Sequence, residues 1–364
     1  MKLKTVIIFI LVFTIITTVI VLASMYIADS EFRDNVDRYI LKKEVFVEDT
    51  SFVLIDSEEN PYICSYSKYI AIISKNKLKA YTANAKKDFE LDISVSNPLT
   101  SSNADYLAVA EKNGSKLYSI SEKSIKWTKE VEGEIAKIVV NSRGLIAVTS
   151  KQTSYKTIII LFDKSGKEVF KTYLATNSVV AMDISDDNKH LCFAEANSSG
   201  MVIEYNIKVI DIAQAKVIYT YVNQDNRLIL NINIQDKNRI VCMYDDKVSV
   251  ISETDNQVVY ENFKDMLFVD IGLDNSIFNM KNSELSIMNL NNKKESVYKV
   301  EDVPKTVKSY GKNIAINFGQ EAYFINSNGW LLKRYESKEE IKDIILGNKI
   351  AGIVYRNRIN FIKI

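Results

Sequence analysis

Hydrophobic residues follow two different patterns along this chain of 364 residues. Near the N-terminus they form one unbroken run, and from Tyr62 onward they alternate with polar residues in short segments that recur. A long unbroken run predicts a membrane-spanning helix, whereas alternation with a period of two predicts half-buried β-strands. We therefore expect one apolar helix followed by a large β-domain.

The unbroken run extends from Thr5 to Ala28 and contains no charged residue. As a helix, a run of this length would span about 36 Å, which exceeds the roughly 30 Å hydrocarbon core of a bilayer. A secretory signal usually has an apolar stretch of only about 7–15 residues and then a small-residue cleavage site. Ala23, Ser24 and Ala28 match such a site poorly. The sequence thus favours an uncleaved transmembrane helix over residues 5–28, with a cleaved signal as the alternative.

The orientation of this helix cannot be read from a count of basic residues alone. Lys2 and Lys4 favour a cytoplasmic tail at residues 1–4, but the far flank is also rich in basic residues. Large C-terminal domains are translocated largely regardless of their charge. We therefore expect a single-pass protein of the cell membrane with a cytoplasmic N-terminus and an extracytoplasmic β-domain.

Residues 29–43 form a strongly charged segment between the anchor and the β-domain. Phe32, Val36, Tyr39 and Ile40 recur in it at helical spacing, which places them on one stripe of a helix. The simplest interpretation is a short juxtamembrane stalk helix. A dimerising helix and a helix lying on the membrane are the alternatives.

A short strand pattern recurs eight times between Lys77 and Ile362. Its first apolar residues are Leu78, Leu117, Ile158, Val209, Val248, Leu285, Ala322 and Ile359. The intervals are 39, 41, 51, 39, 37, 37 and 37 residues, and a longer hairpin at 194–206 explains the third. Another apolar strand precedes each copy, and a polar turn and a fourth strand follow the first seven. Four antiparallel strands per repeat are typical of a propeller blade.

The expected fold is therefore an all-β propeller of eight four-stranded blades over residues 44–364. The last copy is not followed by a fourth strand, and a strand within residues 44–55, from Lys43–Val47 or Ser51–Ile55, is expected to supply it. Such a closure removes the exposed edges of the sheet at the two ends of the ring. Seven blades are the alternative, with Pro98–Gly133 as the degenerate unit because its outer turn carries no clear signal.

Two units resemble the quinoprotein-like propeller repeat, in which an Asp or Asn and a Gly turn follow the third strand. They are Asp163–Phe170 and Asn326–Leu332. The resemblance implies a propeller and no quinone cofactor. The whole layout is also similar to membrane-anchored propeller proteins of Gram-positive bacteria with no known activity.

Composition offers little support for catalysis or nucleic-acid binding. The net charge is +1 and only eleven glycines are present, so neither a basic field nor a Gly-rich phosphate loop is indicated. His190 is the single histidine, which excludes a His-pair metal site and argues against a Ser-His-Asp triad. Cys64, Cys192 and Cys242 share no metal-site spacing, and apolar neighbours favour a buried position for Cys192 and Cys242.

Three acidic pairs were considered as glycosidase carboxylates. Asp186–Asp187, Asp245–Asp246 and Glu58–Glu59 all fall in expected turns, which favours local hydrogen bonding over catalysis. Trp127 and Trp330 stand at the beginnings of outermost strands. Trp330, directly after a tight turn, is the one candidate binding residue.

The sequence thus predicts no catalytic residue, no cofactor and no metal site. The expected function is a non-catalytic protein-interaction scaffold in the cell envelope, with the membrane and other envelope proteins as partners and no nucleic acid. A small-ligand or glycan-binding sensor is the first alternative, and an extracytoplasmic hydrolase or quinone-dependent enzyme is the second.

Overall fold

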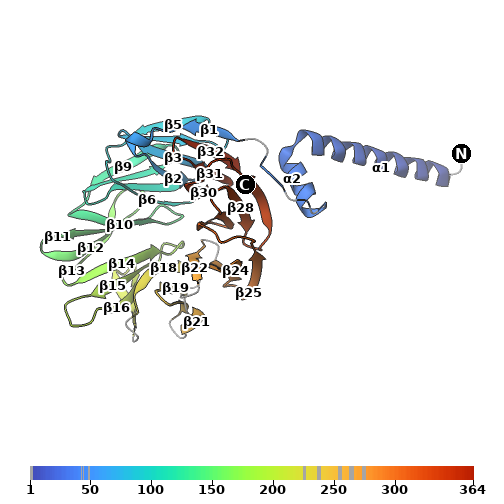
Figure 1. Ribbon diagram of the computed structural model, residues 1–364. Coiled ribbons are helices and arrows are strands. Elements are labelled where there is room, and N and C mark those ends of the chain that lie inside the picture. The colour runs from blue at the N-terminus through green and yellow to red at the C-terminus, as the bar shows by residue number, and fades with distance from the viewer. Residues whose placement is uncertain are drawn as a thin grey trace.

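The computed structural model describes residues 3–41, 43, 45–47, 50–223, 227–235, 239–252, 256–261, 266–272 and 276–364. Helices α1 (Leu3–Ala28) and α2 (Ser30–Tyr39) come first. The strands after them form eight sheets of four strands each, which are the blades of a propeller (Figure 1). Eight blades are therefore confirmed, and the seven-bladed alternative is wrong.

Each blade is an antiparallel sheet whose strands run in chain order from the central channel to the rim, except that the outermost strand of blade 8 is β1. Blades 1 to 4 contain β2 (Tyr62–Tyr66), β3 (Tyr69–Ser74), β4 (Lys77–Tyr81), β5 (Lys87–Asp92); β6 (Pro98–Asn103), β7 (Tyr106–Glu111), β8 (Lys116–Ser121), β9 (Ser124–Glu130); β10 (Glu134–Val140), β11 (Ile146–Gln152), β12 (Tyr155–Phe162), β13 (Glu168–Leu174); and β14 (Asn177–Ile184), β15 (His190–Asn197), β16 (Glu204–Asp211), β17 (Lys216–Val222). Blades 5 to 8 contain β18 (Ile229–Gln235), β19 (Arg239–Tyr244), β20 (Lys247–Ile251), β21 (Asn256–Glu261); β22 (Met266–Ile271), β23 (Ser276–Lys281), β24 (Glu284–Asn289), β25 (Lys294–Lys299); β26 (Thr306–Tyr310), β27 (Asn313–Asn317), β28 (Glu321–Asn326), β29 (Leu331–Glu336); and β30 (Asp343–Gly347), β31 (Ile350–Val354), β32 (Arg358–Lys363), β1 (Ser51–Leu54).

The hydrophobic core lies between neighbouring blades. The second strand of a blade is packed on both faces, so it reads as a continuous apolar run, as in β31, whose five residues are all buried. Outermost strands such as β9 have one exposed face and alternate with charged residues. Because each blade covers its neighbour, the core is complete only when the ring is closed.

The unit Pro98–Gly133 folds as a regular blade although its outer turn has no turn residues. Glu122 and Lys123 connect β8 to β9, and both adopt positive φ, +47° and +63°. Two successive positive φ values are those of a two-residue hairpin turn that usually contains Asn or Gly. The residues typical of this turn are therefore missing from the sequence, although the turn has the usual backbone geometry.

The longest interval between repeats is explained by the hairpin of blade 4. Strands β15 and β16 are eight residues each and pair along their whole length, from His190↔Asp211 to Asn197↔Glu204. Residues 198–203 form its tip.

The ring is closed by β1, which pairs with β32 from Ser51↔Phe361 to Leu54↔Arg358. Residues 45–47 do not take part in this closure. They lie parallel to β29 at the rim of blade 7, where Phe46 bridges Arg334. Of the segment 44–55, Ser51–Leu54 therefore provides the fourth strand of blade 8, and residues 44, 48 and 49 lie outside the described residues.

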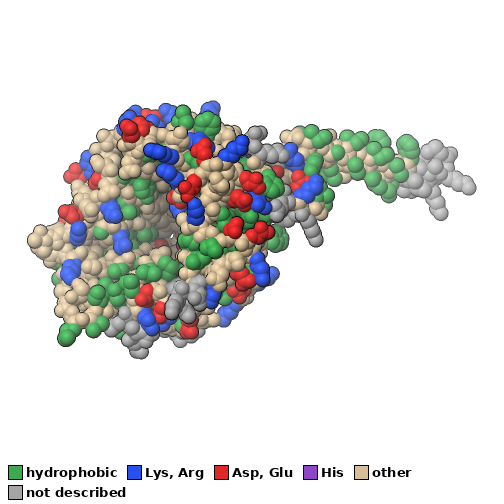
Figure 2. Space-filling model, viewed as in Figure 1, with side chains coloured by type: hydrophobic (Ala, Val, Ile, Leu, Met, Phe, Trp, Pro, Cys, Tyr) green, Lys and Arg blue, Asp and Glu red, His purple; other side chains and the backbone are tan. Residues whose placement is uncertain are grey.

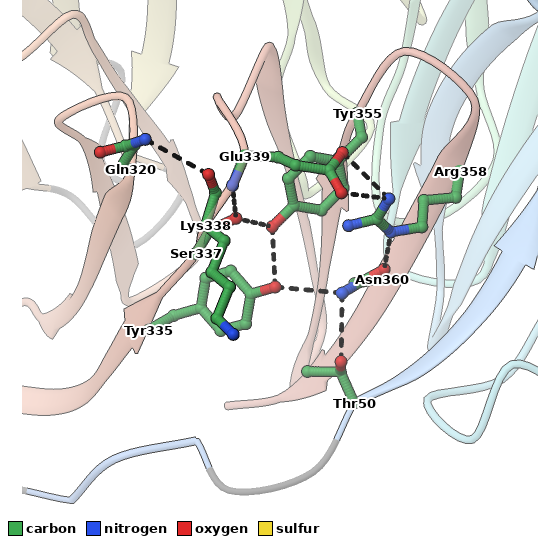
Figure 3. Close-up of polar contacts among 9 residues, drawn as sticks. All are labelled: Thr50, Gln320, Tyr335, Ser337, Lys338, Glu339, Tyr355, Arg358 and Asn360. Carbon is green, nitrogen blue, oxygen red and sulfur yellow. Dashed lines mark hydrogen bonds and ion pairs between the residues drawn. The ribbon is translucent and has the colours of Figure 1, made fainter.

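A buried polar network supports the closure at the boundary between blades 7 and 8 (Figure 3). The Asn360 amide donates to the Tyr335 hydroxyl at 3.0 Å and to Thr50 Oγ1, just before β1, at 3.1 Å. The hydroxyls of Tyr335 and Tyr355 lie 2.8 Å apart, and Tyr355 donates to Ser337 Oγ at 2.8 Å. Because these groups are buried, the removal of one leaves its partners unsatisfied.

Helix α1 is the one helix, among the described residues, that is long and apolar enough to cross a membrane. None of its apolar segment Phe9–Ala28 is buried against the propeller. The two helices leave from the rim of the disc, beside β28 and the C-terminus (Figure 1).

Candidate functional site

The eight innermost strands β2, β6, β10, β14, β18, β22, β26 and β30 surround the central channel. Because strands within a blade are antiparallel, all eight begin on the same face of the disc, which we call the mouth face. The loops between blades and the turns between second and third strands also lie on this face. Figure 2 shows a hollow at the centre of the disc and hydrophobic side chains gathered along its lower side, over β14, β18 and β22.

Bulges at the start of four innermost strands create part of this apolar surface. The pairing with the second strand skips one residue in each of blades 3 to 6, namely Ala136, Val180, Leu230 and Leu267. A bulge redirects the side chain of the extra residue away from the regular pleat. In blades 5 and 6 that residue is a leucine, and the side chains of Leu230 and Leu267 are 49% and 45% exposed.

Further exposed aliphatic residues belong to a loop and a hairpin turn on the same mouth face. Val222 and Leu228 flank the loop between blades 4 and 5, and the tip of the β15–β16 hairpin carries Met201, Val202 and Ile203. Together with Leu230 and Leu267 they form what we call the apolar crescent. An exposed patch of this kind marks an interaction site on a soluble domain.

Charged residues occupy the other side of the channel mouth. Lys308 on β26 forms an ion pair with Asp343 on β30 at 2.7 Å, and Lys305, just before β26, pairs with Glu340. These pairs join blades 7 and 8. The described mouth face therefore carries exposed aliphatic residues together with the Arg227–Asp246 ion pair at blades 4 to 6, and ion pairs at blades 7 and 8.

A ring of polar side chains lies deeper in the channel wall. Asp183, Asn233 and Asp270 occupy equivalent positions on β14, β18 and β22. Asp183 Oδ2 accepts hydrogen bonds from Asn233 Nδ2 at 2.8 Å and from the Ile234 backbone N–H at 2.9 Å. Asp270 accepts from the Ser309 hydroxyl of the next blade. Each carboxylate thus connects two adjacent innermost strands.

Burial raises the pKa of Asp183 to about 7, although the Ile234 and Ile184 N–H groups favour its charged form. Burial also raises the pKa of Asp270. A carboxyl group whose pKa is higher in the folded than in the unfolded state binds its proton more tightly when folded. Its contribution to stability is therefore present at low pH and is lost as the pH rises through the folded-state pKa.

We expect the free energy of unfolding, measured by chemical denaturation, to fall by about 1–3 kcal/mol as the pH is raised from 5 to 8. The reason is the deprotonation of Asp183 in the channel wall. Asp183→Asn keeps an acceptor toward Ile234 and removes the titration, so its slope against pH should be smaller. Part of the slope remains because Asp270 titrates in the same direction.

The control is Glu168→Gln, at an exposed position on β13. It should leave the pH dependence of unfolding as in the original chain. An equally steep slope in the Asp183→Asn variant would show that Asp183 does not titrate in this window.

The residues considered for catalysis serve as structural contacts. Asp186 accepts from Ser142, Asp187 accepts from the Ser185 hydroxyl, and Asp246 pairs with Arg227 at 3.0 Å. Glu59 pairs with Lys75 after the 3₁₀ turn Ser57–Glu59. His190 is buried at the start of β15, and all three cysteines are buried. Within the described part of the chain no three His, Cys, Asp or Glu residues gather closely enough to hold a metal ion.

The two tryptophans have different environments. Trp127 lies over Gly166 of the next blade, where a Cβ atom would come within 2.9 Å of the ring, and its Nε1 donates to the Lys164 carbonyl at 3.1 Å. Trp330 is about half exposed in the β28–β29 turn. That turn is on the face opposite the mouth, so Trp330 stays a predicted binding residue that is separate from the apolar crescent.

Sequence reasoning missed Leu230, Leu267, Asp183 and Asp270. One signal for the leucines was present. Ile229–Leu230 and Met266–Leu267 are consecutive apolar pairs at the start of a strand, where strict alternation would place one polar residue. A bulge can accommodate such a pair, because the extra residue leaves the regular pleat.

Comparisons with known proteins agree with the propeller fold. The chain is similar to BamB from Moraxella catarrhalis, at 11% identity and a TM-score of 0.53, over 86% of this chain and 98% of that chain. It is also similar to Sqt1 from Chaetomium thermophilum, solved bound to the N-terminus of the ribosomal protein L10, at 10% identity and a TM-score of 0.54, over 83% and 96% of the two chains. Kuenenia stuttgartiensis hydrazine synthase matches at 14% identity and a TM-score of 0.45, over 90% and 99%.

At these identities the likeness concerns the fold alone. No curated protein matches the chain. The resemblance to the quinoprotein-like repeat stays a prediction. Residues 43–364, which include the whole propeller, match the family of unknown function DUF5711, and the chain belongs to that family.

Proposed function

We propose that this protein is a membrane-tethered, non-catalytic docking platform that binds another protein through its mouth face. The observation that carries the proposal is the apolar crescent at the rim of the channel. Leu230 and Leu267 stand on bulges in the innermost strands, so the fold presents these side chains to the outside.

The energetics of the crescent favour a protein partner. Burial of an exposed leucine side chain is worth about 1.5–3 kcal/mol, and binding energy concentrates in a few central, well-buried side chains. Two leucines around a hollow can enclose one aliphatic or aromatic side chain of a partner. The adjacent ion pairs Lys308–Asp343 and Lys305–Glu340 supply a polar rim.

The expected partner segment is a chain end or exposed loop with aliphatic side chains. Sqt1, which shares the fold, is bound to the N-terminus of a ribosomal protein, so a propeller of this general shape can hold a chain end. In the present protein the hollow at the centre of the disc is the place where such a chain end would dock (Figure 2).

The small-ligand alternative would need free polar groups in the channel. Asp183, Asn233 and Asp270 are polar side chains of its wall, and they already bond to neighbouring strands. This pattern favours a structural role for them. The aliphatic rim above them suits a protein better than a glycan.

The tether in this proposal is α1. Its twenty-six residues correspond to about 39 Å of helix, enough to cross a bilayer. Lys2 comes just before it, Lys4 lies in its first turn and the large propeller follows, which favours a cytoplasmic N-terminus and an extracytoplasmic propeller. The partner is then expected among proteins of the cell envelope.

Site-specific photo-crosslinking in intact membranes tests the proposal. A photoreactive amino acid at Leu267 should crosslink to a second protein, because this side chain faces the partner. The same amino acid at Val169, an exposed aliphatic position on the outermost strand β13, is the control and should not capture that protein. Capture at Val169 but not at Leu267 would place the docking surface elsewhere.

A further inference from the structure

The joint between the two helices shows how the propeller is held relative to the anchor. Asp29 belongs to both helices, since its N–H donates to the Met25 carbonyl of α1 and its carboxylate accepts from the Phe32 N–H of α2. The Tyr26 hydroxyl donates to Asp37 at 2.7 Å. In one straight helix, residues eleven apart are separated by about 16 Å along the axis, beyond the reach of that bond. Helix α2 must therefore turn away from the axis of α1.

One face of α2 contacts the propeller. Asp34 forms an ion pair with Lys333 of β29 at 2.8 Å, and both side chains are 17% exposed. Arg33, Asp34 and Asp37 line a cavity of about 460 Å³ between the helix and blades 7 and 8. The polar side of α2 is therefore directed at the rim of the propeller.

The residues after α2 bind the same rim. The Val47 N–H donates to the Arg334 carbonyl at 3.0 Å, and the Arg334 N–H donates to the Val45 carbonyl at 2.9 Å. The Arg334 guanidinium also lies over the Phe46 ring. Together with the Asp34–Lys333 ion pair, these bonds fix α2 against the edge of blade 7.

The apolar stripe of α2 lies on another side of the helix. At about 100° per residue, Phe32 and Val36 are centred about 150° away from Asp34 and Asp37. Ile40 continues the stripe, because its N–H donates to the Val36 carbonyl, and its side chain is 71% exposed. Phe32 and Val36 are half-buried and Ile40 is exposed, so the exposed end of the stripe lies on the side of the helix opposite its contact with the propeller.

We infer that α2 lies on the bilayer surface, with its apolar stripe in the lipid interface and its polar face clamping the rim of blades 7 and 8. The partner of the stripe is inferred to be lipid because only Asp29 separates α2 from α1, which is the proposed membrane anchor. An amphipathic helix that follows a membrane span and turns away from its axis can lie along the bilayer surface. It then buries its apolar face at the boundary between headgroups and acyl chains. The inference rests on the membrane tether in the proposed function.

This arrangement defines how the mouth face is presented. Both helices leave from the rim of the disc rather than from a face (Figure 1). The propeller therefore stands edge-on to the membrane, and the apolar crescent opens sideways along its surface. The partner is then one that approaches within the plane of the membrane or is itself tethered to it.

Spin labelling of the full chain in phospholipid vesicles tests this placement. Cysteine replaces Ile40 on the stripe in one variant and Asn35, an exposed polar position of the same helix, in the other. The native cysteines are buried and compete little for the label. We expect the ratio of collisions with oxygen to collisions with a water-soluble nickel chelate to be about five-fold higher at Ile40 than at Asn35, because oxygen concentrates in lipid.

Two outcomes would overturn the inference. Equal access of the nickel chelate to both positions would mean that α2 is a stalk standing in water. A spectrum at Ile40 broadened by a second label, and sharpened by dilution with unlabelled protein, would mean that the stripe pairs with another copy.

A third label at Ile16, in the middle of α1, separates this inference from the proposed tether. If Ile16 is lipid-exposed while Ile40 is not, the anchor is kept and only the placement of α2 is wrong. If the chelate reaches Ile16, the tether itself fails and the inference fails with it. Crosslinking at Leu267 still reports on the mouth face in either case.

Discussion

Replacement of Val53 by proline is expected to open the propeller ring and to lower the free energy of unfolding by about 2–3 kcal/mol. Val53 is central in β1, which is the fourth strand of blade 8. The Ile55 N–H donates to the Asn357 carbonyl at 2.9 Å. Along an antiparallel strand, the N–H groups of every second residue point at the same neighbouring strand. Val53 is therefore the next residue before Ile55 whose N–H points at β32. Proline removes that donor.

The effect is large because little else holds β1. Its pairing with β32 covers four residues, and Phe52 and Leu54 are mostly exposed. The side chains that depend on the closure are those between blades 8 and 1, where Ile70 and Ile72 pack against Ile359 and Phe361. Opening the ring exposes this layer and leaves β32 with an unpaired edge, which favours aggregation.

Phe52→Pro is the matched control. The N–H of Phe52 points away from β32 by the same alternation, and proline is tolerated where an edge strand faces solvent. We expect a loss of less than about 1 kcal/mol for this variant, measured by chemical unfolding alongside Val53→Pro. Equal losses in the two variants would mean that β1 does not close the ring through its hydrogen bonds.

The propeller and its blade count could be predicted from the sequence because each blade repeats the same pattern of apolar and polar residues. The second strand must be apolar on both faces and the third must alternate, so eight copies of that pattern indicate eight blades. The unit Pro98–Gly133 was doubtful only because Glu122 and Lys123 form its outer turn without Asn or Gly. Turn residues are a preference, and these two side chains adopt positive φ within an otherwise regular blade.

The mouth face could not be predicted because its residues lie far apart in the sequence. Leu230 and Leu267 belong to different blades, and a bulge decides that they are exposed. Asp183 has no feature in the sequence that distinguishes it from other strand aspartates. Its raised pKa follows from burial beside Asn233 and Ile234 of the next blade, which only the closed ring brings near.

The two N-terminal helices α1 and α2 could be predicted from the sequence to different extents. The prediction of a helix over an uncharged apolar run such as Thr5–Ala28 needs only the local composition, so it could be made from the sequence. The stripe Phe32–Val36–Ile40 was evident too, but it left a stalk, a dimerising helix and a membrane-lying helix open. The contact of Asp34 with Lys333 is what orients α2, and residues almost three hundred positions apart give no such signal.

Introduction of glutamate at both Leu230 and Leu267 is expected to weaken partner binding by about 100-fold or more. Each substitution removes an apolar side chain from the rim of the channel and adds a charge that must lose its water when the partner docks. The fold should be unaffected, because both residues sit on bulges and their side chains are about half exposed. Unchanged chemical unfolding would confirm that the fold is kept.

The double variant Val169→Glu and Val297→Glu is the matched control. These valines are exposed on the outermost strands β13 and β25, so the variant adds the same charge and removes similar apolar area at the rim of the disc. Binding should then change by less than about three-fold, as is usual outside the centre of an interface.

The most direct test of the mouth face as a docking surface is the dissociation constant of the protein captured at Leu267, measured for the original chain and for both double variants. A docking surface at the apolar crescent predicts binding lost in the Leu230→Glu, Leu267→Glu variant and kept in the Val169→Glu, Val297→Glu variant. Equal affinity of all three proteins for that partner would contradict it.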